Sequence, residues 1–413
     1  MSLILATLTL TSILINFINM MMKTTTALWL PAGEALELMQ VRPQTLYASV
    51  SRGRIRAKPD SADPRRSLYH RDDVQRIAAR TRGRRSSETV ASETIQWGEP
   101  VLASGVSTFA HGQLLYRGQD ACALAAHATL EEVAGLLWES APPRFAAAAP
   151  AAQQQTHKKN TTPLQAGLLA LAARAATDLP SRGRSRAVLQ AEAADIIGTL
   201  ADALLPAPAR IKKEVPLHMR LASAWRRPHA ADDLRRALVL LADHELNAST
   251  FAARVTASTG ASLAACLLTG LSTLTGPLHG GAAATVQALM RNAADIGTEA
   301  AVREWLAHDH RPEAFGHPLY PNGDARCSAL LAGIDLPPAF AELRAVGEKL
   351  LGEAVNIDFA LAALAAVHKL PPGAPLTLFA LARTVGWTAH VLEQQATGQL
   401  IRPRARYTGP AAS

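Results

Sequence analysis

Gly276-Pro277-Leu278-His279-Gly280-Gly281 begins the part of the chain around which we expect the fold to be arranged. This part continues through Phe315-Gly316-His317 and Asp324-Ala325-Arg326, and it closes on Asn356-Ile357-Asp358-Phe359. Its two histidines, its arginine and its final carboxylate each lie beside glycine, proline or another turn former. Such residues mark the ends of elements and let the backbone approach a ligand, and functional side chains tend to lie there.

These side-chain types suit chemistry at a carbon next to a carbonyl group. A carboxylate can remove a proton, a neutral imidazole can donate a hydrogen bond to a developing oxyanion, and a guanidinium can bind a carboxylate through two hydrogen bonds. The alternative is that these are ordinary core or surface histidines of an alanine-rich helical protein, which is the commoner situation for a single histidine. The rest of the chain favours the first interpretation.

The order of further segments resembles the citrate synthase family. Asp243-His244-Glu245-Leu246-Asn247-Ala248-Ser249-Thr250 resembles the segment with that family's third histidine, and Arg383-Thr384-Val385-Gly386-Trp387-Thr388-Ala389-His390 resembles its arginine-bearing helix. Arg402-Pro403-Arg404, followed by Tyr407-Thr408-Gly409, resembles the terminal tail. Leu115-Tyr116-Arg117-Gly118 resembles the opening hairpin of bacterial members. Segments that match in the family's order over most of the chain indicate membership rather than a chance motif.

The resemblance implies a mainly α-helical citrate synthase fold. A large helical domain would comprise residues 95–281 and 363–410, and a smaller inserted domain would comprise residues 282–362. In the family the small domain closes over the large one after oxaloacetate binds, which keeps water from the reacting carbon. The hinges would lie near Gly280-Gly281 and just after Asp358. The composition agrees, because 48% apolar and only 5% aromatic residues favour helices rich in alanine and leucine.

The resemblance also implies a role for seven polar residues. Asp358 would remove a proton from the acyl-CoA, His279 would hydrogen-bond the thioester oxygen, and His317 would polarise the carbonyl of oxaloacetate. The carboxylates of oxaloacetate would be bound by His244, Arg326, Arg383 and Arg402. In the family the last arginine reaches the neighbouring subunit's site, which implies a homodimer. Guanidinium groups suit this task because they bind carboxylates bidentately and are weakly hydrated.

The implied reaction condenses acetyl-CoA with oxaloacetate and water to give citrate and CoA. Propionyl-CoA, which would give 2-methylcitrate, is an alternative donor, because one methyl group is worth only about 1–3 kcal/mol in a pocket. The acyl-CoA would be a co-substrate, and no tightly bound cofactor is expected. The CoA-binding residues are not predicted, because Pro318 and Pro321-Asn322-Gly323 stand where many members are more basic.

Motifs for other chemistries are missing from the sequence. It has no P-loop, no dinucleotide-binding glycine fingerprint and no cluster of metal ligands. Cys122, Cys266 and Cys327 lie far apart without a paired spacing. They predict neither a disulfide framework nor a zinc site, and a cytoplasmic location is therefore expected.

Residues 1–24 form an apolar leader. Ser2 to Ile18 contains no lysine or arginine, so it lacks the basic start of a signal peptide, and polar residues interrupt it as a membrane span. Met20-Met21-Met22 indicates that translation starts there, so that the leader would be a mis-started or disordered segment. The alternative is a weakly membrane-associating helix, but we expect no membrane partner.

Residues 25–85 resemble a small winged helix-turn-helix module of the MerR or excisionase type with a basic linker. Short helices are expected over Glu34–Met39 and over Gln44–Val50 after Pro43, followed by a strand at Ser67-Leu68-Tyr69 and a helix capped by Asp72-Asp73. Much of the net charge of +8 lies here. The candidate DNA-contacting residues are Gln44, Thr45, Tyr47, Arg52 and Arg54.

The module leaves two alternatives open. It could be a helical adaptor whose arginines are merely solvated. It could instead bind operator DNA, and the citrate-synthase-like body would then sense oxaloacetate, citrate or an acyl-CoA. A pure sensor need not keep Asp358, so the presence of all seven candidate polar residues favours catalysis.

Helices are expected wherever apolar residues recur at helical spacing. These segments are Leu164–Thr177, Ser185–Leu205, Asp232–Ala242 and Leu263–Leu274, and Thr129 begins another helix with a capping box. Residues 141–163 are of low complexity and are expected to form an unburied surface loop.

Overall fold

The computed structural model divides the chain into two units. One comprises residues 1–101 with 408–413, and the other, called the body below, comprises residues 102–407. The described residues are 28–39, 41–60, 63, 65–81, 102–110, 112–145, 161–206, 215–280, 282–308, 313–405 and 409. The apolar leader, the linker after Thr81 and the Tyr407-Thr408 part of the tail therefore lie outside the described residues.

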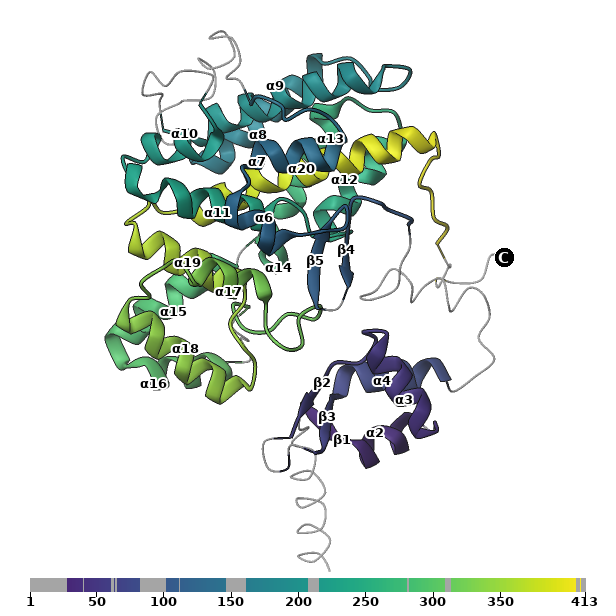
Figure 1. Cartoon of the computed structure of the whole chain (residues 1–413), viewed down its shortest axis with the longest axis vertical. Coiled ribbons are helices and arrows are strands. Elements are labelled where there is room, and N and C mark those ends of the chain that lie inside the picture. The colour runs from purple at the N-terminus through teal and green to yellow at the C-terminus, as the bar shows by residue number, and fades with distance from the viewer. Residues whose placement is uncertain are drawn as a thin grey trace, which may run out of the picture. The chain divides into compact units, whose positions relative to one another are not determined.

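The described part of the body consists of helices and one small antiparallel sheet (Figure 1). The sheet has the strand order β4 (Ser107–Ala110), β5 (Gln113–Tyr116), β6 (Gln119–Asp120). The helices are α6 (Ala121–His127), α7 (Leu130–Trp138), α8 (Pro163–Thr177), α9 (Arg186–Leu204), α10 (Leu217–Ala224), the 3-10 turn η2 (Pro228–Ala230), α11 (Ala231–Leu241), α12 (Ala248–Ser258), α13 (Leu263–Leu274), α14 (Pro277–Gly280), α15 (Ala282–Ile296), α16 (Thr298–Ala307), α17 (Ala325–Leu331), α18 (Pro338–Leu351), α19 (Ile357–Val367) and α20 (Ala374–Thr397).

Helix α20 is the centre of one group of helices. It is apolar on nearly all sides, and α7, α9, α11, α12 and α13 pack around it, as the yellow helix in Figure 1 shows. Small residues allow this close packing. A Cβ atom at Gly270 of α13 would lie 2.8 Å from the indole ring of Trp387, so this contact requires glycine. Because the helix is held from several directions, the polar side chains that it carries are held in place.

The helix boundaries follow the local sequence signals. The capping box predicted at Thr129 is present, with Glu132 as its partner. Thr162 forms a second capping box with Gln165 at the start of α8, and the side chain of Ser185 caps α9. The predicted helices within residues 164–274 agree with α8, α9, α11 and α13 to within one or two residues.

The predicted unburied loop over residues 141–163 is wrong at its two ends. Phe145 is buried against Trp138, and Thr162 belongs to a helix cap. The low-complexity character of the segment concealed the single aromatic residue that anchors its start. Residues 146–160, the middle of this segment, lie outside the described residues.

A second group of helices comprises α15 to α19, which pack on one another in the lower left of Figure 1. The small domain predicted over residues 282–362 would contain α15 to α18 and the first part of α19. Helix α19 continues without a break past residue 362 to Val367 and also packs against α20. The exact domain boundaries and the hinges stay predictions.

The first unit has a β-α-α-β-β-α order. Its elements are β1 (Trp29–Pro31), α2 (Ala32–Met39), α3 (Pro43–Ser51), β2 (Ala57–Pro59), β3 (Ser67–His70) and α4 (Arg71–Thr81), and the sheet has the antiparallel order β1-β3-β2. A small apolar core that includes Leu30, Met39, Leu46 and Tyr69 holds these elements together. The predicted helices and the predicted strand are present. Among the described helices of either unit, none is long and apolar enough to span a membrane.

Candidate active site

The loop between α11 and α12 carries His244, the first of the three predicted histidines. Its side chain is only 7% exposed, and its ring centroid lies 5.0 Å from that of His317 and 4.8 Å from that of Phe109. Burial, reinforced by the positive charge of Arg326, holds the pKa of His244 well below its usual range. The imidazole is therefore neutral at physiological pH.

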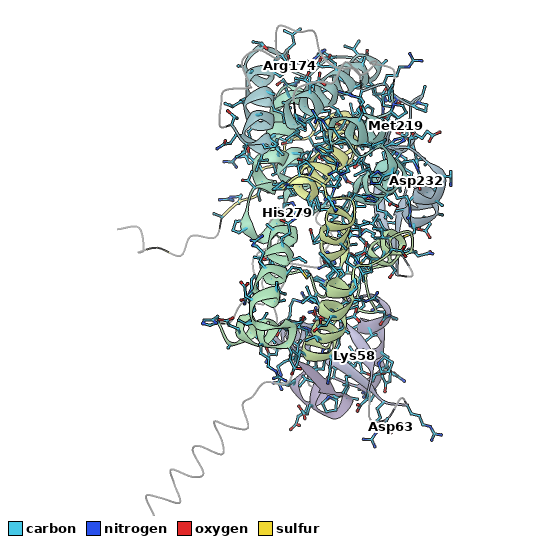
Figure 2. The ribbon with its side chains drawn as sticks, turned by 90° about the vertical axis from the view of Figure 1, so that its left-hand side faces the viewer. Lys58, Asp63, Arg174, Met219, Asp232 and His279 are labelled. Carbon is cyan, nitrogen blue, oxygen red and sulfur yellow. The ribbon has the colours of Figure 1, made fainter. Side chains whose placement is uncertain are left out.

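His279 lies on the short helix α14, between the group of helices around α20 and the group that begins with α15 (Figure 2). The ring is half-buried, and its centroid is 6.4 Å from that of Phe379 on α20. Burial lowers the pKa of His279 to about 4, and the charge of Arg383 adds to this shift. This second imidazole is thus also neutral, as a hydrogen-bond donor to an oxyanion should be.

Ser249, on the first turn of α12, contacts the ring of His279. Its Oγ accepts a hydrogen bond from Trp387 Nε1 at 3.1 Å and lies 2.8 Å from His279 Nε2 and 2.7 Å from Asn247 Oδ1. The serine has a single proton for two acceptors. If that proton points at His279 Nε2, then Nδ1 carries the imidazole proton and can donate to a substrate oxygen.

His317 lies in the loop that precedes α17 and is half-buried. Its Nδ1 accepts a hydrogen bond from the backbone N–H of Leu319 at 3.1 Å. A neutral imidazole that accepts at one nitrogen carries its proton on the other. His317 therefore presents an Nε2–H donor, which is the form required to polarise a carbonyl group.

Arg326 on α17 is buried, and its guanidinium binds Asp324 bidentately. Nε lies 3.0 Å from Oδ1 and Nη2 lies 2.8 Å from Oδ2. Burial by itself would lower the pKa of Arg326. The negative charge of Asp324 acts in the opposite direction and holds this pKa above its usual value. Asp324 also accepts hydrogen bonds from the backbone of Arg326 and of Ile357. The carboxylate thus ties the starts of α17 and α19 together and holds Arg326 at that junction.

Asp358 is the second residue of α19, and its N–H donates to the capping residue Asn356 at 3.0 Å. Burial raises the pKa of Asp358 to about 6, and the nearby carboxylates of Asp324 and Glu313 contribute to this shift. Arg326 and Arg383 act in the opposite direction. The carboxyl group therefore loses its proton only near neutral pH, where an efficient general base operates.

Arg383 on α20 is 1% exposed. Its Nε donates to the carbonyl oxygen of Leu241 at 2.9 Å, and its guanidinium carbon lies 4.6 Å from the ring centroid of Phe379. Burial lowers the pKa of Arg383 to about 10. Among the described residues, no carboxylate lies within ion-pair distance of this guanidinium. The negative charge of Asp243 acts on Arg383 only from beyond ion-pair distance. A buried cation that no carboxylate contacts is suited to bind an anionic ligand.

The remaining predicted residue, Arg402, is not brought to this cluster within one chain. It lies after the end of α20, and its side chain is exposed. The other six residues affect one another electrostatically: Arg326 and Arg383 influence both His244 and Asp358, and His279 and His317 influence His244. In the part of the chain that is described, no group of side chains has the composition of a metal site.

Sequence reasoning missed several residues of this cluster. Phe109, Ser249, Tyr320 and Asp324 each contact a predicted residue. Ser249 and Asp324 occur within segments that were singled out, so their polar character was a signal. Phe109 comes from a strand far away in the sequence, and nothing in the sequence indicated that it would meet His244.

The comparisons with known proteins concern the family and the fold of the chain. The family model "Citrate synthase, C-terminal domain" matches residues 95–404. The citrate synthase of Haloferax volcanii is 39% identical over 191 residues, which are 43% of this chain and 50% of that protein. The 2-methylcitrate synthase 1 of Corynebacterium glutamicum is 34% identical over 198 residues, 44% of this chain and 51% of that protein. The chain thus spans about half the length of these curated relatives.

Solved structures are similar over more of the chain. The crystal structure of citrate synthase from Thermotoga maritima has a TM-score of 0.63 at 26% identity and covers 76% of this chain and 95% of its own. A second similar structure is citrate synthase from Thermoplasma acidophilum in a ternary complex with carboxymethyl coenzyme A and oxaloacetate. Its TM-score is 0.64 at 24% identity, and the match again covers 76% of this chain and 95% of the other. At this identity the match shows that the two chains share a fold. The chain belongs to the citrate synthase family.

Proposed function

We propose that the body is a citrate synthase-type acyltransferase that condenses an acyl-CoA with oxaloacetate and water and releases CoA. One observation carries the proposal. A carboxyl group whose pKa is about 6, neutral imidazoles and a buried arginine that no carboxylate among the described residues contacts occupy one electrostatic neighbourhood. These are a base, donors for an oxyanion and an anion-binding group. The relatives supply the choice of reaction, since they include both citrate and 2-methylcitrate synthases.

In this proposal the first step is removal of a proton by Asp358. The carboxylate takes it from the carbon next to the thioester carbonyl, and His279 donates a hydrogen bond to the thioester oxygen. That role requires the Ser249 proton to point at His279 Nε2. The enol carbon then forms a bond to the keto carbon of oxaloacetate, whose oxygen accepts from His317. Water finally cleaves the thioester and releases CoA as the thiol.

The same proposal assigns the two carboxylates of oxaloacetate to cationic and neutral donors. Arg383, Arg326 and His244 would bind them from one chain. Arg402 is exposed in the single chain, so its role requires a second copy, and we propose a homodimer in which it reaches the neighbouring site. The free state of all three cysteines favours a cytoplasmic location for this enzyme. We propose no tightly bound cofactor.

The experiment is release of free thiol with oxaloacetate and either acetyl-CoA or propionyl-CoA, compared side by side. The wild-type protein should release thiol, and Asp358→Asn should reduce turnover about a thousandfold or more, because general-base catalysis is lost while the side-chain volume is kept. Asp335→Asn, an exposed carboxylate in the same group of helices, is the matched control and should leave turnover unchanged. Equal turnover in the two variants would refute the mechanism.

A second candidate function belongs to the first unit, which we propose binds double-stranded DNA as a winged helix-turn-helix module. The side chains of Gln44, Thr45, Tyr47, Arg52 and Arg54 are all exposed, and Tyr47 is 55% exposed. Among the described residues, no carboxylate lies within ion-pair distance of Arg52 or Arg54. Exposed arginines without acidic partners, next to the exposed polar face of a helix, are suited to phosphate contact.

This function is tested with the full chain and a fluorescent duplex of mixed sequence over a range of salt concentrations. Binding should weaken steeply with salt, and the double variant Arg52→Ala with Arg54→Ala should reduce the dependence of log K on log salt by about 2. Arg303→Ala, an exposed arginine on α16 outside the first unit, is the control for the loss of a surface charge. Adding oxaloacetate tests the sensor alternative. The same salt dependence of DNA binding in the wild type, the double variant and Arg303→Ala would refute DNA binding through this unit.

A further inference from the structure

Tyr320 lies at the centre of the polar cluster, although neither its sequence context nor the reaction assigns it a role. It is 4% exposed. Its ring centroid is 5.1 Å from both Phe109 and His317, and the guanidinium carbon of Arg326 lies 4.9 Å from the same centroid. The ring of Tyr320 therefore contacts Phe109 of β4, His317 of the loop before α17, and Arg326 of α17.

The hydroxyl group of Tyr320 lies 3.2 Å from Nε2 of His244. Among the described residues, this is the one hydrogen-bond partner that the hydroxyl has. Burial raises the pKa of Tyr320, so the hydroxyl keeps its proton. Buried donors are nearly always satisfied, and Nε2 of His244 is the acceptor within reach. A tyrosine that donates to Nε2 places the imidazole proton of His244 on Nδ1.

We propose that Tyr320 is a positioning residue of the dicarboxylate subsite: its hydroxyl holds His244 as the Nδ1–H tautomer, and its ring supports Arg326. The inference rests on the proposed function, because that function makes His244 and Arg326 ligands of oxaloacetate. Nδ1 of His244 has no hydrogen-bond partner among the described residues and is not fully buried, so this edge of the ring is open to a ligand. An N–H at that edge attracts a carboxylate, whereas the lone pair of the other tautomer would repel it.

The arrangement is complementary to that of His317. The backbone of Leu319 fixes His317 as the Nε2–H form, and Tyr320 fixes His244 as the Nδ1–H form. The two rings meet edge to face at 85°. A segment of a few residues, from His317 to Tyr320, thereby sets the tautomers of two neutral imidazoles.

The direct test is the tautomer itself. In wild-type protein labelled with ¹⁵N-histidine, the His244 signals, assigned by comparison with His244→Gln, should show a protonated Nδ1 and an unprotonated Nε2. In Tyr320→Phe the preference should weaken. A protonated Nε2 in the wild type would overturn the inference, and this result does not depend on any activity.

The functional test is the KM for oxaloacetate in Tyr320→Phe. It should rise about tenfold, with kcat reduced less than about threefold, because a misplaced donor weakens substrate binding. In a His244→Gln background the same substitution should add little, since the two residues act as one unit. Tyr116→Phe is the matched control, because its hydroxyl bonds to the backbone of Val239, Leu240 and Asp243 and not to the imidazole.

The outcomes separate the two proposals. An equal rise of KM in Tyr116→Phe and Tyr320→Phe would mean general support of the loop and would overturn the positioning role. If the wild-type protein releases no thiol from either acyl-CoA, the proposed function fails, while the tautomer measurement still decides whether Tyr320 controls His244.

Discussion

The arginines of the two units are placed in opposite surroundings. In the body, Arg326 and Arg383 are buried; Arg326 is bound to Asp324, and no carboxylate of the described part of the chain contacts Arg383. In the first unit, Arg56 is bound to Asp73, whereas Arg52 and Arg54 are exposed. Each unit thus contains an arginine that a carboxylate holds in place. Each also contains an arginine that no carboxylate among the described residues contacts. Burial makes the difference: a desolvated guanidinium suits one small dicarboxylate, and an exposed one suits an extended polyanion.

The largest effect that tests this comparison is expected for Arg383→Met. Oxaloacetate affinity should fall about a thousandfold, because a buried cation that no carboxylate among the described residues contacts is removed from an anion subsite. Stability should change little, since an apolar side chain of similar length replaces a desolvated charge. Calorimetric titration and thermal unfolding measure the two effects. A large loss of Tm with unchanged affinity would show that Arg383 is structural.

The next test concerns the carboxylate that holds an arginine in the first unit. Asp73 accepts from Arg56 Nε at 2.7 Å and from Arg76 Nη2 at 2.6 Å. Asp73→Ala should destabilise this unit by about 3 kcal/mol, because it leaves largely buried Arg56 unpaired. Hydrogen exchange in α2 to α4, compared with the body, measures this locally. The exposed neighbour Asp72→Ala should have almost no effect, and equal effects would contradict the assignment.

A smaller effect is expected at Asp358, whose folded pKa of about 6 lies above the usual 3.8. The folded state then binds more protons between about pH 4 and 6, so stability falls as pH rises through this window. Asp358→Asn should therefore raise stability at pH 8 by about 2–3 kcal/mol and lose this advantage near pH 4. Thermal unfolding across pH measures the difference. The kcat/KM of the wild type should fall below about pH 6, because the base becomes protonated.

The smallest effect is expected from Arg52→Ala alone. DNA affinity should fall only a fewfold at moderate salt, and the dependence on log salt should decrease by about 1. The unfolding temperature should not change, because the side chain is exposed and has no carboxylate partner among the described residues. Fluorescence anisotropy at several salt concentrations makes the measurement. A shift in Tm would indicate that Arg52 supports the fold.

Much of the local structure could be predicted because its signals are short-range. Pro43 marks the start of α3, Thr129 with Glu132 marks the start of α7, and Asn356 caps the helix that carries Asp358. The prediction failed for Phe145, because a low-complexity segment gives no sign that one aromatic residue will be buried. It also missed the bidentate pair of Asp324 and Arg326, because a neighbouring carboxylate is equally compatible with a solvated side chain.

The order of segments along the sequence determined the family, the helical class and the set of candidate side chains, because spacing and residue type are properties of the chain alone. Only the tertiary structure decided their protonation and their partners. His244 is neutral and Asp358 has a pKa of about 6 because residues distant in sequence remove water from these groups. Among the described residues, no carboxylate contacts the guanidinium of Arg383. Desolvation depends on what surrounds a side chain in space, and no local pattern of residues encodes it.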